Sequence, residues 1–161
     1  MIENMLKLDR TDLKILSILQ ESARITNQEL ANRIHLSPSS SLTRVRRLEE
    51  SGIIKAYHAS IDLNQLCRSI MCIATVSIQS QAKKDYSEFQ NYISRVPEII
   101  ECFTVSGTFD FIMKVVSPDM NRYMAITDDL IDAVKAEITL NTHVVMNENK
   151  LYSGFPLNKL L

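Results

Sequence analysis

The sequence is poor in the residues that build several common kinds of site. Only three of its 161 residues are glycine, and no glycine-rich phosphate loop or nucleophile–base pair occurs, so we do not expect an enzyme. Cys67, Cys72 and Cys102 are an odd number without Cys-x-x-Cys spacing, and three scattered histidines lack neighbouring ligands. We therefore expect no disulfide, no bound metal and no cofactor. We interpret the cysteines as small core residues.

The sequence also lacks a long apolar run. The longest, residues 70–78, is interrupted by Thr75 and Ser77 and is far shorter than the roughly 20 residues of a membrane-spanning helix. The first residues show no basic start, apolar middle and cleavage site of a secretion signal. With 45% hydrophobic and 23% charged residues, the composition is typical of a globular protein, and we expect a cytoplasmic location.

The sequence lacks an excess of charge of one sign, because its formal net charge is only −1. Residues 1–60 carry nine basic and seven acidic residues, a net +2, whereas residues 61–161 carry nine and twelve, a net −3. These halves are the two predicted domains. Binding to nucleic acid would depend on a local cluster of cations and on pairing of two chains, and Arg44, Arg46 and Arg47 form such a cluster.

The first half predicts three short helices. Each follows a side chain that accepts hydrogen bonds from the free N–H groups of a helix start: Asp9, Thr26 and Ser37, the last followed by Pro38. The third helix is expected to end near Glu50, before Gly52, and a strand to follow over residues 53–61. Two short helices with a tight turn, an earlier helix and a strand predict a winged helix-turn-helix domain.

The third predicted helix has two different faces. At 100° per residue, Ser41, Leu42, Val45 and Leu48 gather on the inner face. The candidate DNA-contacting residues are Ser37, Ser39, Ser40, Thr43, Arg44, Arg46 and Arg47. The short hydroxylated start lets the backbone approach a major groove, and the arginines can reach phosphates or guanine edges. Alternatively, the arginines only complement the helix dipole and pair with Glu49 and Glu50.

The second half predicts the order β, α, β, β, α, β, which makes the whole chain an α+β protein. Strands are expected over 71–79, 99–105, 109–116 and 138–146, and helices over 83–95 and from Met120, after Asp119. This split arrangement leaves one face of an antiparallel sheet without helices, and an exposed apolar face favours a second copy. The apolar tail, residues 151–161, is expected to dock on another surface.

Three blocks of sequence, in order, resemble the Lrp/AsnC (leucine-responsive, feast/famine) family of transcription regulators. They are residues 8–54, LDRTDLKILSILQESARITNQELANRIHLSPSSSLTRVRRLEESGII, then SGTFDFIMKVVSPDM and THVVM. His35 stands where the family often has glycine, and Ser41 where it often has cysteine. The resemblance implies a winged helix-turn-helix reader, a ferredoxin-like βαββαβ sensing domain, homodimers and often octamers.

The resemblance also implies an effector, an amino acid or related metabolite, between paired sensing domains near SGTFD. A zwitterion needs a carboxylate such as Asp110 for its ammonium group and amides such as those of Gly107 and Thr108 for its carboxylate. The candidate effector residues are Ser106, Gly107, Thr108, Asp110, Met120, Thr142, His143, Val144 and Val145. In the alternative interpretation, Asp110 caps the hairpin and the methionine and valines are core.

The favoured hypothesis is a sequence-specific, DNA-binding transcriptional regulator whose DNA binding or assembly responds allosterically to an amino acid. A second hypothesis is a tetrapyrrole (siroheme) decarboxylase-like subunit, which resembles the same family and uses the sensing-domain cavity for catalysis. A third is an assembly protein that does not touch DNA. The arginine-rich helix favours the first, because an enzyme subunit does not need it.

Overall fold

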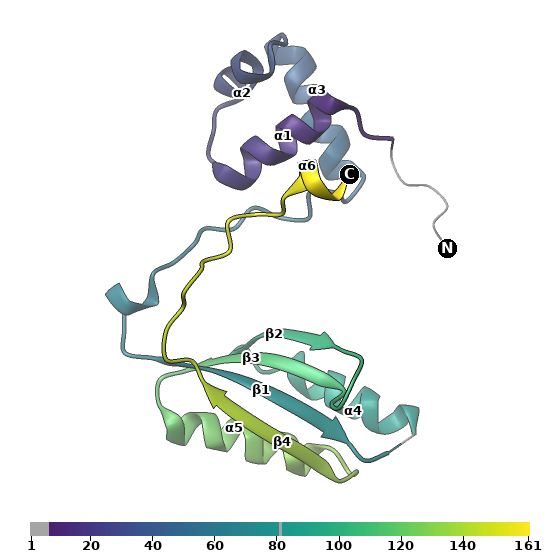
Figure 1. The fold of residues 1–161 in the computed structure, drawn as a ribbon, viewed down its shortest axis with the longest axis vertical. Coiled ribbons are helices and arrows are strands. Elements are labelled where there is room, and N and C mark those ends of the chain that lie inside the picture. Colours follow the sequence, from purple (N-terminus) through teal and green to yellow (C-terminus); the bar gives the residue numbers. More distant parts are fainter. Residues whose placement is uncertain (1–6, 81) are drawn as a thin grey trace. The chain divides into compact units, whose positions relative to one another are not determined.

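The structure is a computed structural model that describes residues 7–80 and 82–161, and the chain divides into two compact units (Figure 1). The first unit combines the chain up to residue 60 with residues 150–161, and the second holds residues 61–149. The sequence assigned the tail to the second domain. Its packing contacts instead lie with the first unit, which a pattern along the chain does not reveal.

The first unit contains three helices, α1 (Arg10–Glu21), α2 (Asn27–Ile34) and α3 (Pro38–Glu50). Their predicted starts are confirmed, because Asp9, Thr26 and Ser37 each accept a hydrogen bond from a backbone N–H three residues on. A small apolar core joins the helices, and its buried members are Ile15, Ile18, Leu30, Ile34 and Leu48. This core fixes α3 against the other two helices.

The strand predicted over residues 53–61 is wrong. Residues 55–62 form neither helix nor strand, and the exposed apolar side chains in and near this segment include Ile53, Tyr57 and Ile61. A strand needs a neighbour that takes up its backbone hydrogen bonds, and alternation of side chains alone does not supply one. The sequence therefore identified a segment suited to a strand, but not one that pairs within this chain.

The tail packs on α1 through a two-way hydrogen bond. The Gln20 side chain donates from Nε2 to the Phe155 carbonyl at 3.2 Å and accepts from the Phe155 N–H at Oε1, at 2.6 Å. Gly154 has φ +97°, and a Cβ there would lie 3.0 Å from Gln20, so this approach requires glycine. The short helix α6 (Leu157–Leu160) then contacts α1, so the predicted docking of the tail is confirmed.

The second unit is the predicted βαββαβ arrangement. Its elements are β1 (Ile70–Ile78), α4 (Lys83–Ile93), β2 (Ile99–Thr104), β3 (Phe111–Ser117), α5 (Met120–Ala133) and β4 (Ile138–Val144), preceded by a 3-10 turn, η1 (Leu63–Gln65). The strands form an antiparallel sheet in the order β2-β3-β1-β4. Both α-helices, α4 and α5, lie on one face of it (Figure 1). The α+β class and the order of elements are confirmed.

The two faces of this sheet differ in burial. The face under the helices is closed, and on it the rings of Phe89 and Phe111 stack with centroids 4.3 Å apart. The opposite face carries Met71, Ile73, Ile112 and Val116, all only partly buried, and Phe103, which is 56% exposed. This open sheet face is partly apolar, as the sequence predicted, but Lys114 and its partner Glu101 lie among these side chains on the same face.

Some single-residue predictions were wrong. Cys72 is buried in the sheet core and Cys102 half-buried, but Cys67 is exposed in the segment before β1. Ile131 of α5 is also exposed, because it lies outside the stripe of that helix that packs on the sheet. Within the described residues, no helix combines the length and the apolar character needed to cross a membrane.

Ser41 is an unfavourable residue in the core of the first unit, and replacing it should stabilise the protein. Its side chain is fully buried, and its hydroxyl has no hydrogen-bond partner in the part of the chain that the structure describes. Ser41→Ala removes this cost, so we expect the free energy of unfolding to rise by about 1 kcal/mol and Tm by about 2–4 °C in thermal unfolding.

The matched control is Ser39→Ala, on the exposed face of the same helix, which gains helix propensity and loses only a solvent-exposed hydrogen bond with the Ser37 hydroxyl. Equal Tm values for wild type and Ser41→Ala would contradict the interpretation that the buried Ser41 hydroxyl destabilises the protein.

Candidate nucleic-acid interface

A tight turn sets α3 against α2. His35 ends α2 with φ +57°, a left-handed conformation that explains why glycine suits this position. The Leu36 N–H donates to the Ala31 carbonyl at 3.0 Å, and Asn27 Nδ2 donates to the Pro38 carbonyl at 2.8 Å. The start of α3 is therefore held by hydrogen bonds on both sides of the turn.

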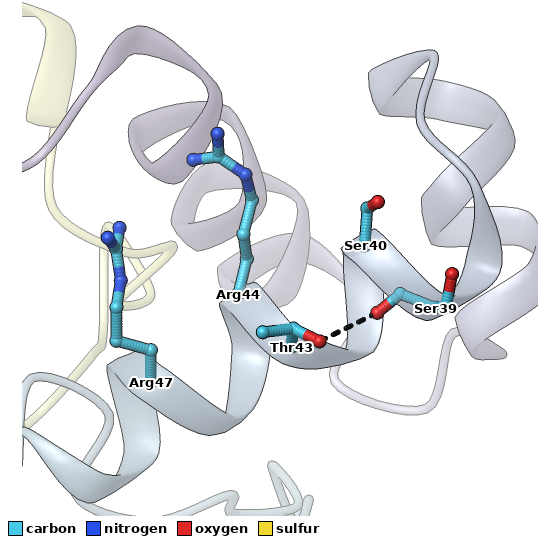
Figure 2. A pocket seen from close by; sticks show the side chains of 5 residues that line it. All are labelled: Ser39, Ser40, Thr43, Arg44 and Arg47. Atoms are coloured by element: carbon cyan, nitrogen blue, oxygen red, sulfur yellow. Dashed lines mark hydrogen bonds between the residues drawn. The ribbon is translucent and has the colours of Figure 1, made fainter.

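The outer face of α3 forms a shallow groove. Ser39, Ser40, Thr43, Arg44 and Arg47 line it, and Figure 2 shows these side chains along the helix. All five belong to the predicted DNA-contacting set, and the structure brings them together on one surface. Hydroxyl groups occupy its first turn and guanidinium groups its later turns, a pattern suited to phosphate oxygens and base edges.

The remaining members of the set differ from these five. Ser37 lies at the cap of α3, where its hydroxyl accepts from the Ser40 N–H at 3.2 Å and donates to the Ser40 hydroxyl at 2.9 Å. Arg46 is exposed beside the groove, and the structure records no ion pair for it among residues 7–80 and 82–161. Leu42, predicted on the inner face, is 40% exposed, because α1 and α2 cover a narrower stripe of α3.

Two of the arginines form ion pairs with α1. Arg44 Nη1 lies 2.7 Å from Asp9 Oδ2 and 2.8 Å from Asp12 Oδ1. Arg47 Nη2 lies 2.5 Å from Asp12 Oδ2. The alternative from sequence, pairing with Glu49 and Glu50, named the wrong partners, and Glu49 instead accepts a hydrogen bond from the Tyr57 hydroxyl.

These contacts shift the acid–base equilibria of the surface groups. The Asp12 backbone N–H, followed by the Arg44 side chain, lowers the pKa of Asp9. Hydrogen bonds to Asp9 and then Asp12 raise the pKa of Arg44. Both shifts favour the charged forms, so Asp9 and Arg44 hold opposite charges throughout the neutral range.

The pattern of the sequence identified Asp9 only as a helix start. Asp9 and Asp12 do form a capping box there, but the contacts of both residues with α3 were missed. Thirty-two residues separate Asp12 from Arg44. No spacing along one helix predicts that pair, because it exists only once α1 packs across α3.

At one end of the second unit's sheet, Asp110 anchors the β2–β3 hairpin. Its Oδ2 accepts from the Ile78 N–H at 2.8 Å and its Oδ1 from the Tyr86 hydroxyl at 3.1 Å. The turn that joins the strands contains Gly107 with φ +129°. The capping role that the sequence left open for Asp110 is therefore present, and it ties the turn to β1 and α4.

The other candidate effector residues lie at the opposite end. Val144 pairs with Cys72 near the start of β1, and Met120 follows the end of β3. Six residues of β1 separate Cys72 from Ile78, roughly 20 Å in a strand. The hairpin turn at 106–108 and the Met120–Val144 group therefore do not meet in one pocket of a single chain.

The candidate effector residues on β4 lie on two different faces of the sheet, because side chains alternate along a strand. Thr142 lies on the helix face, where its hydroxyl is 2.7 Å from that of Tyr123, and Val144 shares that face. His143, opposite Ile73, belongs to the open sheet face, and Val145 follows it with the same alternation. Only an arrangement with more than one copy can bring all nine candidates to one ligand.

The two units define a class of protein: a DNA-binding helix-turn-helix reader joined to a βαββαβ domain with one open sheet face. Residues 8–55 match the family described as winged helix-turn-helix DNA-binding, and residues 71–154 match the Lrp/AsnC ligand binding domain. The chain belongs to the Lrp/AsnC family of DNA-binding transcriptional regulators.

Relatives of known name agree with this assignment. The chain is 36% identical, over 89% of its length and 87% of the relative's, to the leucine-responsive regulatory protein of Escherichia coli strain K12. A transcriptional regulator from Neisseria meningitidis, solved with L-methionine, superposes with a TM-score of 0.87 at 34% identity, over 96% of this chain and 100% of that one. An AsnC family regulator from Agrobacterium tumefaciens gives 0.86 at 27% identity, with the same coverage.

Removing the Asp110 carboxylate should loosen the hairpin. Asp110→Ala leaves the Ile78 N–H and the Tyr86 hydroxyl without their acceptor, and we expect the free energy of unfolding to fall by about 1–3 kcal/mol in urea titrations. Exchange of the Ile78 amide hydrogen should accelerate.

The matched control is Tyr86→Phe, which removes one of these two hydrogen bonds and keeps the carboxylate. It should cost less and leave the Ile78 amide protected. Identical exchange in wild type and Asp110→Ala would disprove the anchoring role.

Proposed function

We propose that α3 enters the major groove of an operator and that Ser37, Ser39, Ser40, Thr43, Arg44, Arg46 and Arg47 make the DNA contacts. The observation that carries this proposal is the groove on α3, where hydroxyl and guanidinium groups line one exposed surface (Figure 2). Phosphate contacts would orient the helix, and arginine contacts to guanine edges would read sequence.

We propose further that the functional protein is a homodimer, assembling to an octamer. The open sheet face supports this, because its apolar side chains, which include Met71, Ile73 and Phe103, leave water when a second copy covers them. Two copies would present two α3 helices to successive half-sites, so the operator should be roughly palindromic.

The proposed effector is an amino acid, in line with the L-methionine bound by the Neisseria meningitidis relative. Asp110 already accepts two hydrogen bonds, but a carboxylate has about four acceptor positions, which leaves capacity for an ammonium group. In this proposal one copy contributes Ser106, Gly107, Thr108 and Asp110. Another copy contributes Met120, Thr142, His143, Val144 and Val145, and because β4 is an edge strand of the sheet, side chains from both of its faces can approach a ligand at that edge. Ligand binding would then favour one assembly over another and so alter DNA binding.

A regulator of transcription acts where DNA is, so we propose a cytoplasmic location. We also propose that the chain is not an enzyme. The named relatives are transcription regulators, which does not favour the tetrapyrrole (siroheme) decarboxylase hypothesis, and the same holds for an assembly protein that avoids DNA.

Arg46 tests the DNA-contacting role of α3. Arg46→Ala should weaken binding to any duplex to a similar degree, because an exposed cation acts mainly on phosphates. The slope of log affinity against log salt should become shallower by about 1 for each copy that contacts DNA, as measured by fluorescence anisotropy.

The matched control is Lys14→Ala, which removes an exposed positive charge from α1. Equal losses in the two variants would mean that net charge, and not the position on α3, matters.

A thermal-shift screen with the twenty amino acids tests the effector. A ligand at 100 times its Kd stabilises the native state by about 2.7 kcal/mol, so L-methionine or another amino acid should raise Tm by about 5–10 °C. Asp110→Asn should abolish this rise and preserve ligand-free DNA binding.

Tyr86→Phe, which keeps the carboxylate, should retain the rise. A full rise of Tm in Asp110→Asn would show that Asp110 does not belong to the effector site. If none of the twenty amino acids raised Tm, the proposal of an amino-acid effector would be contradicted.

A further inference from the structure

Asp12 is the most deeply buried charged residue among the described residues of the first unit. Its side chain has no solvent exposure, and both of its oxygens are used. Oδ1 accepts from Arg44 Nη1, and Oδ2 accepts from Arg47 Nη2 and from the Asp9 N–H, at 2.8, 2.5 and 3.1 Å. The capping box needs only the hydrogen bond from the Asp9 N–H. The two contacts with the arginines therefore require another explanation.

Burial makes these contacts obligatory. A carboxylate taken out of water is stable only when charged partners and hydrogen bonds replace its hydration, and both arginines supply them here. Arg44 and Arg47 lose much of their rotamer freedom in return, before any DNA is present. Their guanidinium groups therefore have fixed positions at the groove, held by a residue on a different helix.

The contacts leave donors free for DNA. The recorded bonds use one terminal nitrogen of each guanidinium group, Nη1 of Arg44 and Nη2 of Arg47. An arginine has five N–H donors, so both side chains retain donors for base edges or phosphates. Side-chain exposures of 30% for Arg44 and 45% for Arg47 make them accessible.

The same contacts reduce the attraction of α3 for DNA of arbitrary sequence. Asp9 and Asp12 balance the charges of Arg44 and Arg47, so this group of four has no net charge. Phosphate attraction that is independent of sequence depends on net positive charge, whereas base contacts depend on geometry. Asp12 therefore weakens the first kind of binding and pre-orients the groups that make the second.

We infer that Asp12 is a positioning residue that determines how well this protein distinguishes its operator from other DNA, by holding Arg44 and Arg47 through ion pairs across α1 and α3. Asp12 does not touch DNA itself. The inference rests on the proposed contacts of α3 with DNA and adds a residue that lies outside that surface.

The test compares two duplexes. One is the duplex that the wild-type chain enriches from a random-sequence pool, and the other is a scrambled duplex of the same composition. Failure of the wild type to enrich any sequence would refute sequence-specific binding itself, which separates that result from a failure of the inference. The measured quantity is the ratio of the two affinities, over a series of salt concentrations.

Asp12→Asn keeps the size of the side chain and removes its charge. Affinity for the selected duplex should fall at least about fivefold, whereas affinity for the scrambled duplex should rise or stay constant with a steeper salt dependence. The ratio of affinities therefore falls. A purely structural role would lower both affinities together and leave the ratio unchanged.

Glu29→Gln is the matched control. Glu29 makes the same capping box on α2, accepting from the Thr26 N–H at 3.1 Å, and has no recorded ion pair with an arginine in the described part of the chain. Because Glu29 is exposed, this variant should lower Tm less than Asp12→Asn does, and it should leave the ratio of affinities at the wild-type value. An equal fall in the ratio for both variants would overturn the inference.

Asp9→Asn covers the case in which Asp12→Asn does not fold. Asn is as good a helix cap as Asp, so this variant keeps α1 and removes one carboxylate from Arg44. We expect a smaller fall in the ratio and a steeper salt dependence. A wild-type ratio in Asp9→Asn and in any Asp12→Asn that folds would refute the inference.

A double-mutant cycle tests whether Asp12 acts through the arginines. In a chain with Arg44→Ala and Arg47→Ala, adding Asp12→Asn should leave the ratio of affinities unchanged, because nothing remains for Asp12 to position. A second fall of similar size in that background would show that Asp12 acts by another route and would overturn the inference.

Discussion

The ion pairs between the buried Asp12 carboxylate and two arginines are the constraint on which the surface of α3 that we propose to contact DNA depends. They join α1 to α3 and hold Arg44 and Arg47 in position on that surface. A carboxylate without solvent exposure cannot exchange these partners for water, so α1 and α3 act as one surface. The groove of serine, threonine and arginine side chains follows from that arrangement.

The two units are stabilised by different kinds of contact. The first unit has a small core, and its helices are fixed by caps, a left-handed turn at His35 and the tail hydrogen-bonded to Gln20. The second unit has a larger core on one side of its sheet and, on the other, a face without helices that exposes Phe103 and other apolar side chains. The chain passes between the units twice, near residues 60 and 149, so its last residues belong to the first unit.

Much of the fold was predictable because its signals are local. Helix caps, such as Ser37 followed by Pro38, depend on neighbours three residues away, and the βαββαβ order depends on alternation within each strand. The strand expected over 53–61 failed because pairing requires a partner segment. The candidate effector residues, taken from a family resemblance, lie at two ends of one sheet, since β1 runs the whole distance between them.

The sequence by itself determined the three helices of the first unit, the βαββαβ order of the second and the hydroxyl and arginine side chains of α3, because short-range spacing carries these. Membership of the Lrp/AsnC family followed from the resemblance of three sequence blocks. Only the tertiary structure decided which acids hold Arg44 and Arg47, where the tail packs, and that Asp110 anchors a hairpin. Each of these contacts joins residues between 32 and 135 positions apart. Such pairs form only when packed helices and strands bring distant parts of the chain together, and no local pattern encodes them.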